Sequence, residues 1–359
     1  MSTPSDATIE DLLQILVQRG GSDLHISAGA PPKVRVHGEL VDTGHAVMSG
    51  DVTKALVYSF LGGDQIAALE RDREVDLSFG VEGMGRFRVN AFHQRSSVAA
   101  VLRVIPVVVK GFDDLGLPRQ SCEEVAALPR GLVLFTGATG SGKSTSLAAM
   151  LDHINRTRSD HIVTVEDPIE FLHTNKRCLV NQREIGSDTK GFHKALRSAL
   201  RQDPDVVLVG EMRDAETIEA ALTIAETGHL TFGTLHTSDC VQTINRIVDV
   251  FPAHQQQQVR TQLSFTLQAV FCQQLIPTAA GRGRALACEV MIANSAVRAL
   301  IRDDKAHQIY SIIQTGGKVG MKTMNAALAD LVRKRSITME EALTCSSDVE
   351  DLKRILARP

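Results

Sequence analysis

The sequence predicts an α/β protein in which a small N-terminal α+β domain precedes a larger domain built on a parallel sheet. In the first 110 residues, short segments alternate apolar and polar residues, which is typical of half-buried antiparallel strands. Farther along, continuous apolar strands alternate with longer helices, which predicts a parallel sheet covered on both faces. The length of 359 residues is consistent with two or three domains of about 150 residues each.

The first domain is expected to begin with a helix over residues 9–18, because its apolar residues have helical spacing and two glycines follow it. Alternating residues then predict two half-buried strands within 22–41, joined by the turn sequence AGAPP. The remaining elements are expected to be helices at 53–61 and 65–73, a β-hairpin of 74–81 and 85–95, and a strand at 97–106.

A segment containing Gly, Pro and Asp is expected to link the two domains. The predicted boundaries are 1–110 for the first domain, 111–120 for the linker and 121–359 for the second domain. In the second domain, apolar strands are expected at 131–137, 161–167, 205–211 and 230–237. From residue 252 onward the sequence predicts mainly helices, over 253–275, 295–304 and 324–335, and a last one after a capping box of Thr338 and Glu341.

The composition excludes several classes of function. The formal net charge of -3 gives no basic excess, so neither a nucleic-acid partner nor strong attraction to an anionic membrane is expected. No segment approaches the run of about 20 apolar residues that a membrane span needs, and the acidic start lacks the features of a secretory signal. We therefore expect a cytoplasmic protein with reduced, mostly buried cysteines and no CxxC pair: Cys122, Cys178, Cys240, Cys272, Cys288 and Cys345.

The segment GATGSGKS, from Gly137 to Ser144, follows one of the apolar strands and opens a helix. It matches the G-x-x-x-x-G-K-[ST] pattern of a phosphate-binding loop, whose glycines let backbone N–H groups converge on phosphate oxygens. In this pattern Lys143 reaches the terminal phosphates of ATP and the Ser144 hydroxyl ligates Mg²⁺. The predicted nucleotide-binding residues in and beside the loop are Gly137, Ala138, Thr139, Gly140, Ser141, Gly142, Lys143, Ser144 and Thr145.

Acidic residues follow two other apolar strands, in the sequences VEDPIEF and LVGE. Because ligands of a parallel sheet bind at the carboxyl ends of its strands, we expect these carboxylates to gather beside the phosphate-binding loop. Their positive partners would be Lys143 and Mg²⁺ with its nucleotide, and a carboxylate near a water molecule can orient it for phosphoryl transfer. A solvated loop is the alternative. The residues concerned are Glu166, Asp167, Glu170 and Glu211.

Two histidines and several arginines are further candidates. His229 and His236 flank one predicted strand, and His236 is placed to sense the terminal phosphate, although a structural role is the alternative for both. Metal binding by these histidines is not expected, because no spacing groups them with cysteines. The arginines of the first domain form either a solvated strand face or arginine fingers for the nucleotide. They are Arg86, Arg88, Arg95 and Arg103.

Together, the segments GATGSGKST, VEDPIEF, DVVLVGEMRD and ETGHLTFGTLHT resemble the motifs of the type II/IV secretion ATPase superfamily. The similarity is greatest to the retraction ATPases of type IV pili, the PilT type, with PilU-type proteins as near relatives. It includes GSDLHISAG and GRFRVNAF in the first domain and extends over nearly the whole chain. The resemblance implies a PAS-like N-terminal domain and a RecA-like P-loop ATPase domain, assembled as a ring-shaped hexamer.

The resemblance also implies roles for individual residues. Glu170, the last acid of VEDPIEF, corresponds to the water-activating base of this superfamily. Gly210 precedes Glu211 in a sequence that looks like its atypical Walker B motif, whose acid acts on Mg²⁺. The positions that the resemblance adds to nucleotide binding and catalysis are His229 and His236 of the His box, and Arg88 and Arg103 of the N-terminal domain.

The function implied by the resemblance is that of a hexameric ATPase motor that drives pilus retraction and twitching motility. Its implied partners are copies of the same chain, an inner-membrane platform protein of the pilus and, in a shared task, a second retraction ATPase. The expected location is cytoplasmic, at the inner face of the inner membrane, with only peripheral membrane contact. The absence of a four-cysteine element favours retraction over pilus extension or type II secretion.

Other functions stay open at this point. The segment SSDVEDLKRIL resembles the PilU type, which corresponds to an auxiliary retraction ATPase. Residues 296–303, AVRALIRD, differ at three positions from the AIRNLIRE signature of retraction proteins, while Arg298 and Arg302 are kept. A nucleotide-gated regulatory subunit with little turnover is an alternative from another class, and kinase chemistry lacks a recognisable acceptor-binding motif.

Overall fold

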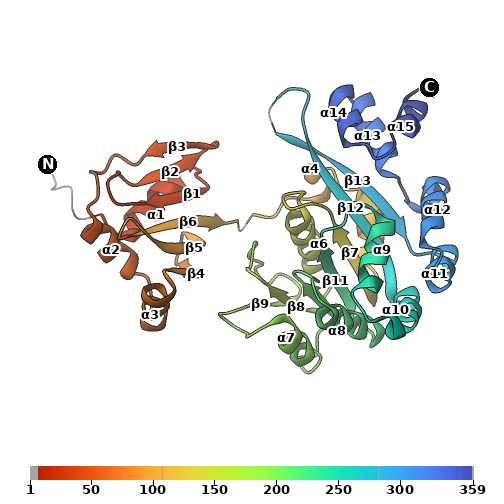
Figure 1. Cartoon of the computed structure of the whole chain (residues 1–359), viewed down its shortest axis with the longest axis horizontal. Coiled ribbons are helices and arrows are strands. Elements are labelled where there is room, and N and C mark those ends of the chain that lie inside the picture. The colour runs from red at the N-terminus through yellow and green to blue at the C-terminus, as the bar shows by residue number, and fades with distance from the viewer. Residues whose placement is uncertain (1–6, 107, 282, 358–359) are drawn as a thin grey trace. The chain divides into compact units, whose positions relative to one another are not determined.

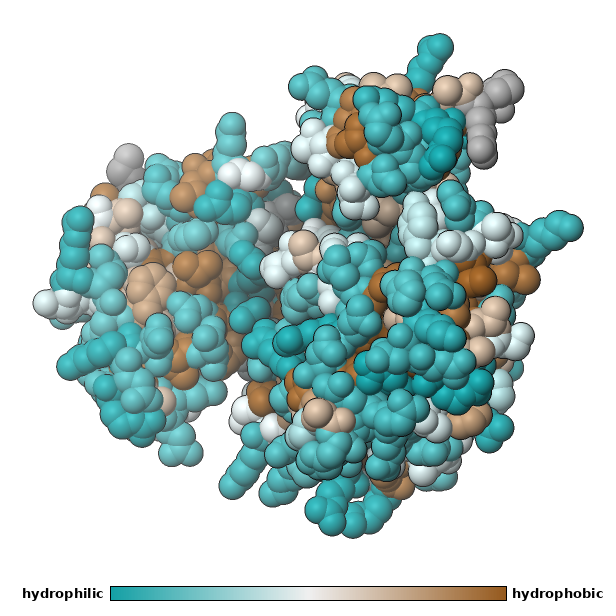
Figure 2. Space-filling model, turned by 45° about the vertical axis from the view of Figure 1, so that its right-hand side comes forward, coloured by the Kyte–Doolittle hydropathy of each residue, from teal (hydrophilic) through white to brown (hydrophobic). Residues whose placement is uncertain are grey.

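The computed structural model describes residues 7–106, 108–281 and 283–357, which belong to two compact units divided between residues 107 and 108 (Figure 1). The predicted fold class is confirmed, because the smaller unit contains an antiparallel sheet and the larger unit a mostly parallel one. Among these residues, no helix combines the length and the apolar character that crossing a membrane requires. Figure 2 shows hydrophilic side chains over most of one face, with hydrophobic ones in scattered patches.

The described part of the smaller unit forms a six-stranded antiparallel sheet with helices packed on one face. Its elements are α1 (Ile9–Gln18), β1 (Asp23–Ile26), β2 (Lys33–Val36), β3 (Glu39–Asp42), α2 (Gly50–Tyr58), α3 (Gly63–Asp72), β4 (Glu74–Val81), β5 (Gly85–Gln94) and β6 (Ser97–Ile105). The strand order is β3-β2-β1-β6-β5-β4. Helix α1 and the hairpin of β4 and β5 have the predicted places, whereas α2 starts three residues earlier than predicted because Ser49 caps it.

The described strands of the larger unit form a seven-stranded sheet in the order β13-β12-β7-β11-β10-β8-β9. All neighbours pair in parallel except β12 and β13, which are antiparallel. The strands are β7 (Gly131–Thr136), β8 (His161–Glu166), β9 (Leu179–Glu184), β10 (Val206–Val209), β11 (Leu230–Leu235), β12 (Leu267–Pro277) and β13 (Arg284–Ile292). The parallel order brings the ends of β7, β8, β10 and β11 to the same edge of the sheet.

Helices cover both faces of this sheet, as the sequence predicts. They are α4 (Phe112–Leu115), α5 (Arg119–Ala126), α6 (Lys143–Thr157), α7 (Phe192–Ala199), α8 (Ala215–Glu226), α9 (Cys240–Asp249), α10 (Ala253–Thr266), α11 (Ser295–Arg302), α12 (Ile309–Thr315), α13 (Met324–Arg333), α14 (Met339–Cys345) and α15 (Val349–Leu356). Residues 132–135 of β7 are apolar at successive positions because both faces of this strand are buried. Leu132 and Leu134 face the core under α8 to α10, whereas Val133 and Phe135 face the core under α5 and α6.

The prediction of one helix over 253–275 is wrong in its second half. Helix α10 ends at Thr266, and the chain continues directly as strand β12 between β7 and β13. Residues 269–272 are apolar at successive positions, and Phe271 stacks on Phe135 of β7 with ring centroids 4.8 Å apart. A short apolar run does not distinguish a buried strand from a helix, and here pairing with two strands decides for the strand. Strand β13 was likewise not predicted.

Other segments also differ from the sequence-based expectation. Strand β9 was not predicted, and β3 adds a third strand where two were expected within 22–41. In 111–120, where the sequence predicts a linker, the short helix α4 forms and α5 begins, and both belong to the larger unit. Near the C-terminus, the single helix expected after Thr338 is followed by a second helix, α15. The Thr338 side chain accepts the backbone N–H of Glu341, so the predicted cap starts α14.

A buried carboxylate joins two helices of the larger unit to its sheet. Glu289 of β13 is only 3% exposed, and its two oxygens accept the backbone N–H groups of Cys240 at 2.9 Å and Met324 at 3.2 Å. These groups begin α9 and α13, where a negative charge also meets the positive end of each helix dipole. Burial raises the pKa of the Glu289 carboxyl. The sulfur atoms of Cys240 and Cys272, 3.8 Å apart, pack beside it, and the cysteines are free and buried except for the half-buried Cys345.

We expect Glu289→Ala to lower the free energy of unfolding by about 3 kcal/mol, because it leaves two buried N–H groups without an acceptor. Glu289→Gln keeps one acceptor oxygen and should lose less. Urea unfolding followed by far-ultraviolet circular dichroism measures both variants. The matched control is Glu340→Ala, which removes an exposed carboxylate in the first turn of α14. Equal stability of the Glu289→Ala and Glu340→Ala variants would contradict the capping role of Glu289.

Candidate active site

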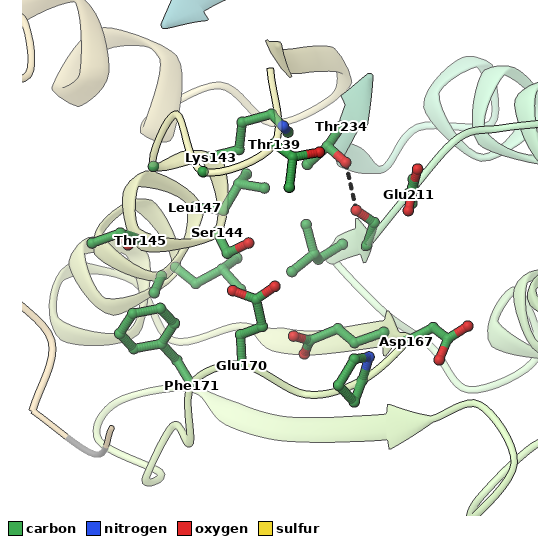
Figure 3. Close-up of a pocket in the computed structure, with 18 of the residues that line it drawn as sticks. Thr139, Lys143, Ser144, Thr145, Leu147, Asp167, Glu170, Phe171, Glu211 and Thr234 are labelled. Atoms are coloured by element: carbon green, nitrogen blue, oxygen red, sulfur yellow. Dashed lines mark hydrogen bonds between the residues drawn. The ribbon is translucent and has the colours of Figure 1, made fainter. Parts of the chain in front are cut away.

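A cleft of about 420 Å³ opens in the larger unit, at the edge of the sheet where β7, β8, β10 and β11 end (Figure 3). The loop between β7 and α6, and the first turns of α6, form one wall. The segment of residues 166–173, which begins at the last residue of β8, forms the opposite wall. Gly210 and Glu211 after β10 and His236 after β11 also line the cleft. The cleft thus joins the segments that the sequence predicts for nucleotide and metal binding.

The loop from Gly137 to Gly142 begins at a position that only glycine can occupy. Gly137 has φ +139°, and a Cβ atom there would lie 2.4 Å from the carbonyl oxygen of Gln273 and 2.6 Å from the Ser141 hydroxyl. Gly140 and Gly142 also have positive φ angles, +80° and +92°. The loop can therefore curl tightly against β12 before α6 begins at Lys143. This is the backbone that the phosphate-binding motif requires.

Lys143 and Ser144 lie where this loop passes into the helix. The Lys143 side chain is 8% exposed, and its ammonium group donates to the carbonyl oxygens of Gly137 at 2.8 Å and Ala138 at 3.1 Å. Burial lowers the pKa of Lys143, while the negative charges of Glu211 and Glu170 oppose that shift. Thr139, Gly140, Gly142, Ser144 and Thr145 also line the cleft, whereas the Ser141 side chain is buried under the loop.

The four predicted carboxylates line the same cleft but point in different directions. Glu170 extends from the 166–173 segment toward Ser144, whereas Asp167 turns its carboxylate away from that residue (Figure 3). Burial raises the pKa of the Glu166 carboxyl, although hydrogen bonds from Thr164, Gln182 and the Glu170 backbone act in the opposite direction. The exposed Glu170 is therefore the acid of this segment that faces the phosphate-binding loop.

Glu211 is the acid at the end of β10. Burial acts to raise the pKa of its carboxyl, but the hydrogen bonds and charges of Arg213 and His236 outweigh it and hold the pKa below its ordinary value. The His236 Nε2 lies 2.8 Å from Glu211 Oε1. The structure also shows why position 210 favours glycine, because a Cβ atom there would lie 3.1 Å from the Val165 carbonyl oxygen of the neighbouring strand. Glu211 is thus held ionised, as a metal-binding carboxylate must be.

Three predicted site residues lie elsewhere. His229 precedes β11, at the opposite edge of the sheet from His236, and its Nδ1 lies 3.0 Å from the Ile224 carbonyl oxygen. His229 is therefore not among the residues that line this cleft, and its contact with the nucleotide stays a prediction. Arg88 and Arg103 belong to the smaller unit, where they lie side by side on β5 and β6. Arg103 forms an ion pair of 2.7 Å with Asp23.

The sequence did not single out several residues that the structure places at this site. Arg213 lies two residues after Glu211 and donates a hydrogen bond to its carboxylate. The sequence GEMRD gives only a weak indication of this contact. Arg284 lines the cleft from β13 and donates to the Gly140 carbonyl oxygen at 3.3 Å, but it is 144 residues away along the chain. Gln182 of β9 contacts the 166–173 segment, and a lone glutamine in a polar edge strand gives no sequence signal.

These residues fit a nucleotide with Mg²⁺. The oxygen atoms of Ser144 and Glu211 are the type of ligand that Mg²⁺ prefers, and the glycine loop leaves space where side chains would otherwise intrude. Lys143 and the N-terminus of α6 provide positive charge for phosphate groups. A carboxylate opposite them, Glu170, is placed to orient a water molecule. The arrangement can therefore bind a nucleoside triphosphate and prepare its hydrolysis.

Comparison with known proteins agrees with this interpretation. Residues 3–344 match the family described as type II/IV secretion system protein. The chain is 52% identical over 334 residues to the type IV pilus retraction ATPase PilT of Pseudomonas aeruginosa, which covers 93% of this chain and 96% of that protein. It is 40% identical over 347 residues to the type IV pilus ATPase PilU of the same organism, with coverage of 97% and 91%. A crystal structure of the pilus retraction motor PilT with bound ADP, 49% identical, has a TM-score of 0.91 and covers 97% of this chain and 100% of that one.

We expect Gly137→Ala to abolish tight nucleotide binding and to destabilise the larger unit by about 1–3 kcal/mol, because the new methyl group overlaps the Gln273 carbonyl oxygen. Binding of a fluorescent ADP analogue and urea unfolding measure the two effects. Gly191→Ala is the matched control, since a Cβ atom there meets nothing within 4 Å. Normal nucleotide binding by Gly137→Ala would show that the loop does not need this glycine.

Proposed function

The chain belongs to the type II/IV secretion system protein family and is an ATPase of this family, and we propose that it is the motor that retracts type IV pili. One observation carries the proposal from within the chain. Lys143, Ser144, Glu170 and Glu211 come from three separate segments and line one cleft at the end of the sheet. Similarity over nearly the full length of PilT, greater than to PilU, supports retraction as the work that ATP hydrolysis drives.

The loop and the first turn of α6 would bind the phosphates of ATP. Its backbone N–H groups and the ammonium group of Lys143 supply the positive charge, and Lys143 would exchange the loop carbonyls for phosphate oxygens. Ser144 and Glu211 would hold Mg²⁺, which when bound neutralises charge on the phosphates. His236 and Arg213 keep Glu211 ionised and oriented. These contacts position the terminal phosphate for attack by water.

Glu170 would act as the general base. Its carboxylate points across the cleft toward Ser144, is exposed to solvent and can accept a proton from a water molecule. Phosphoryl transfer to water needs little more from the protein than an oriented nucleophile and compensated charge. Glu166 is less suited, because its carboxylate is engaged by Thr164 and Gln182. The catalytic assignment therefore falls on Glu170.

The proposed motor is a ring-shaped homohexamer at the cytoplasmic face of the inner membrane. Arg88 and Arg103 of the smaller unit would contact the nucleotide, and movement of that unit with ATP binding and release would drive an inner-membrane platform protein of the pilus. The smaller unit can change its position between the ATP and ADP states only if its contacts differ between these two states. A second retraction ATPase would act beside this one in cells that have both.

A specific observation keeps an auxiliary, PilU-like role as the second candidate. The AVRALIRD segment departs from the retraction signature, and the structure gives one of its arginines an internal role. Arg298 donates to the carbonyl oxygens of Ser264 and Phe265 at 2.7 and 2.9 Å, and so holds the end of α10. The fold alone explains Arg298, so the auxiliary role depends on the three positions at which this segment differs from the retraction signature.

We expect Glu170→Gln to lower the turnover of ATP by about 10²–10⁴-fold, because the amide cannot accept the proton of water. ADP binding should be kept, since the phosphate-binding loop is intact. Lys143→Ala should lose both ATP hydrolysis and tight ADP binding. Phosphate release and binding of a fluorescent ADP analogue measure these quantities.

The matched control for these variants is Glu219→Gln, which changes an exposed glutamate on α8 outside the cleft. Its turnover should equal that of the unchanged protein. Full activity of Glu170→Gln would rule out the proposed base, and full activity of Lys143→Ala would rule out the proposed nucleotide site.

We expect a strain that lacks this chain to carry excess surface pili and to lose twitching motility, because pilin subunits would no longer be withdrawn. Electron microscopy and a twitching assay on agar measure the two phenotypes. Loss of pili would instead indicate an extension ATPase. Retained twitching with normal piliation would indicate the auxiliary role.

A further inference from the structure

The segment that carries Glu170 is held in place by side chains of the edge strand β9. Strand β9 pairs in parallel with β8, so that Gln182 lies beside Thr164 and Glu184 lies beside Glu166. Both side chains reach from there to the 166–173 segment that follows β8. Gln182 is half-buried and Glu184 is 4% exposed, so neither is a freely solvated side chain.

Gln182 makes three hydrogen bonds to this segment. Its amide nitrogen donates to the Phe171 carbonyl oxygen at 2.8 Å and to Glu166 Oε1 at 3.2 Å. Its amide oxygen accepts the backbone N–H of His173 at 2.8 Å. A single side chain thereby binds the backbone on both sides of residue 172. A carboxamide suits this task because it offers both a donor and an acceptor, which a carboxylate does not.

Glu184 holds the segment on the other side of the candidate base. Its Oε2 accepts the backbone N–H of Ile169 at 3.2 Å, and the Ser187 hydroxyl donates to its other oxygen at 3.3 Å. The residues directly before and after Glu170 are therefore bonded to two side chains of one strand. Between these two points the Glu170 side chain extends into the cleft (Figure 3).

Gln182 also contacts the acid at the start of this segment. The Glu166 carboxylate receives hydrogen bonds from Gln182 and from the Thr164 hydroxyl at 2.6 Å. Gln182 and Thr164 thus fix the carboxylate from which the segment with Glu170 continues. This also accounts for the first acid of VEDPIEF, which packs against β9 while Glu170 faces the cleft.

We propose that Gln182, together with Glu184, is a positioning residue for ATP hydrolysis, which keeps the Glu170 carboxylate directed at the attacking water. The inference rests on the proposed role of Glu170 as general base. A base must lie within hydrogen-bond reach of the proton that it takes, and a displacement of about 1 Å can cost about 10²-fold in rate. Strand β9 lies at the edge of the sheet and is separated from β7 by β11, β10 and β8, so we expect Gln182 to act on turnover and not on nucleotide affinity.

We expect Gln182→Ala to lower kcat for ATP by about 10–100-fold, because Glu170 then samples orientations that face away from the water. KM for ATP and the affinity for the fluorescent ADP analogue should stay within about twofold of the unchanged protein, since the loop that binds phosphates is untouched. The matched control is Asn181→Ala on the same strand, whose side chain contacts the His161 ring and not the 166–173 segment. Its kcat should be normal.

The double variant Gln182→Ala/Glu170→Gln tests whether Gln182 acts through Glu170. If it does, the double variant should be no slower than Glu170→Gln alone, because the group being positioned is already gone. Glu184→Gln supplies a rescue test, since its amide oxygen can still accept the Ile169 N–H. It should retain more activity than Glu184→Ala.

Each outcome bears on the inference. Normal kcat in Gln182→Ala beside an inactive Glu170→Gln would overturn the inference alone. Full activity of Glu170→Gln would overturn the proposed base and this inference with it. A Gln182→Ala variant that loses ADP affinity as much as kcat would show a general structural role and would also overturn it. Should this variant fail to fold, Gln182→Glu keeps the acceptor for His173 and loses the donors, and the same separation of kcat from KM is expected.

Discussion

The constraint on which the rest of the structure depends is the curl of the backbone between β7 and α6. Gly137 lies so close to the Gln273 carbonyl oxygen that no side chain fits there, and this close approach lets α6 begin directly at Lys143. Because β7 is flanked by parallel strands, the loop opens at the same edge as the ends of β8, β10 and β11. Acids that follow two of these strands then meet the loop across the cleft.

The carboxylates of the larger unit have different hydrogen-bond partners, and these partners determine what each carboxylate does. Glu289 does not line the cleft and caps two helices, Glu166 is held by β9, and Glu211 is kept ionised by Arg213 and His236. Of the four carboxylates that line the cleft, Glu170 is the one that points at the loop from an exposed position (Figure 3). The division of tasks follows from the partners of each carboxylate, since an unpaired buried charge would be costly.

Much of this could be predicted from the sequence, where local signals are strong. The phosphate-binding loop, the parallel sheet and the grouping of its acids all depend on short motifs and strand-end positions. The error over 253–275 arose because β12 is recognisable only by the strands that it pairs with. The sequence also did not indicate the roles of Gln182 and Arg284. The partner of Arg284 is 144 residues away along the chain, and Gln182 belongs to no motif. His229 and His236 flank β11 as predicted and lie at opposite ends of it, so that His236 lines the cleft and the role of His229 in nucleotide binding stays a prediction.

The central claim is that one cleft holds ATP with Mg²⁺ while Glu170 faces the water that attacks it. A crystal structure with Mg²⁺ and a non-hydrolysable ATP analogue tests this most directly. We expect the phosphates against the loop and Lys143, the metal on Ser144 and Glu211, and a water molecule between the terminal phosphate and Glu170. A nucleotide bound elsewhere, or a Glu170 carboxylate turned away from the terminal phosphate, would contradict the claim.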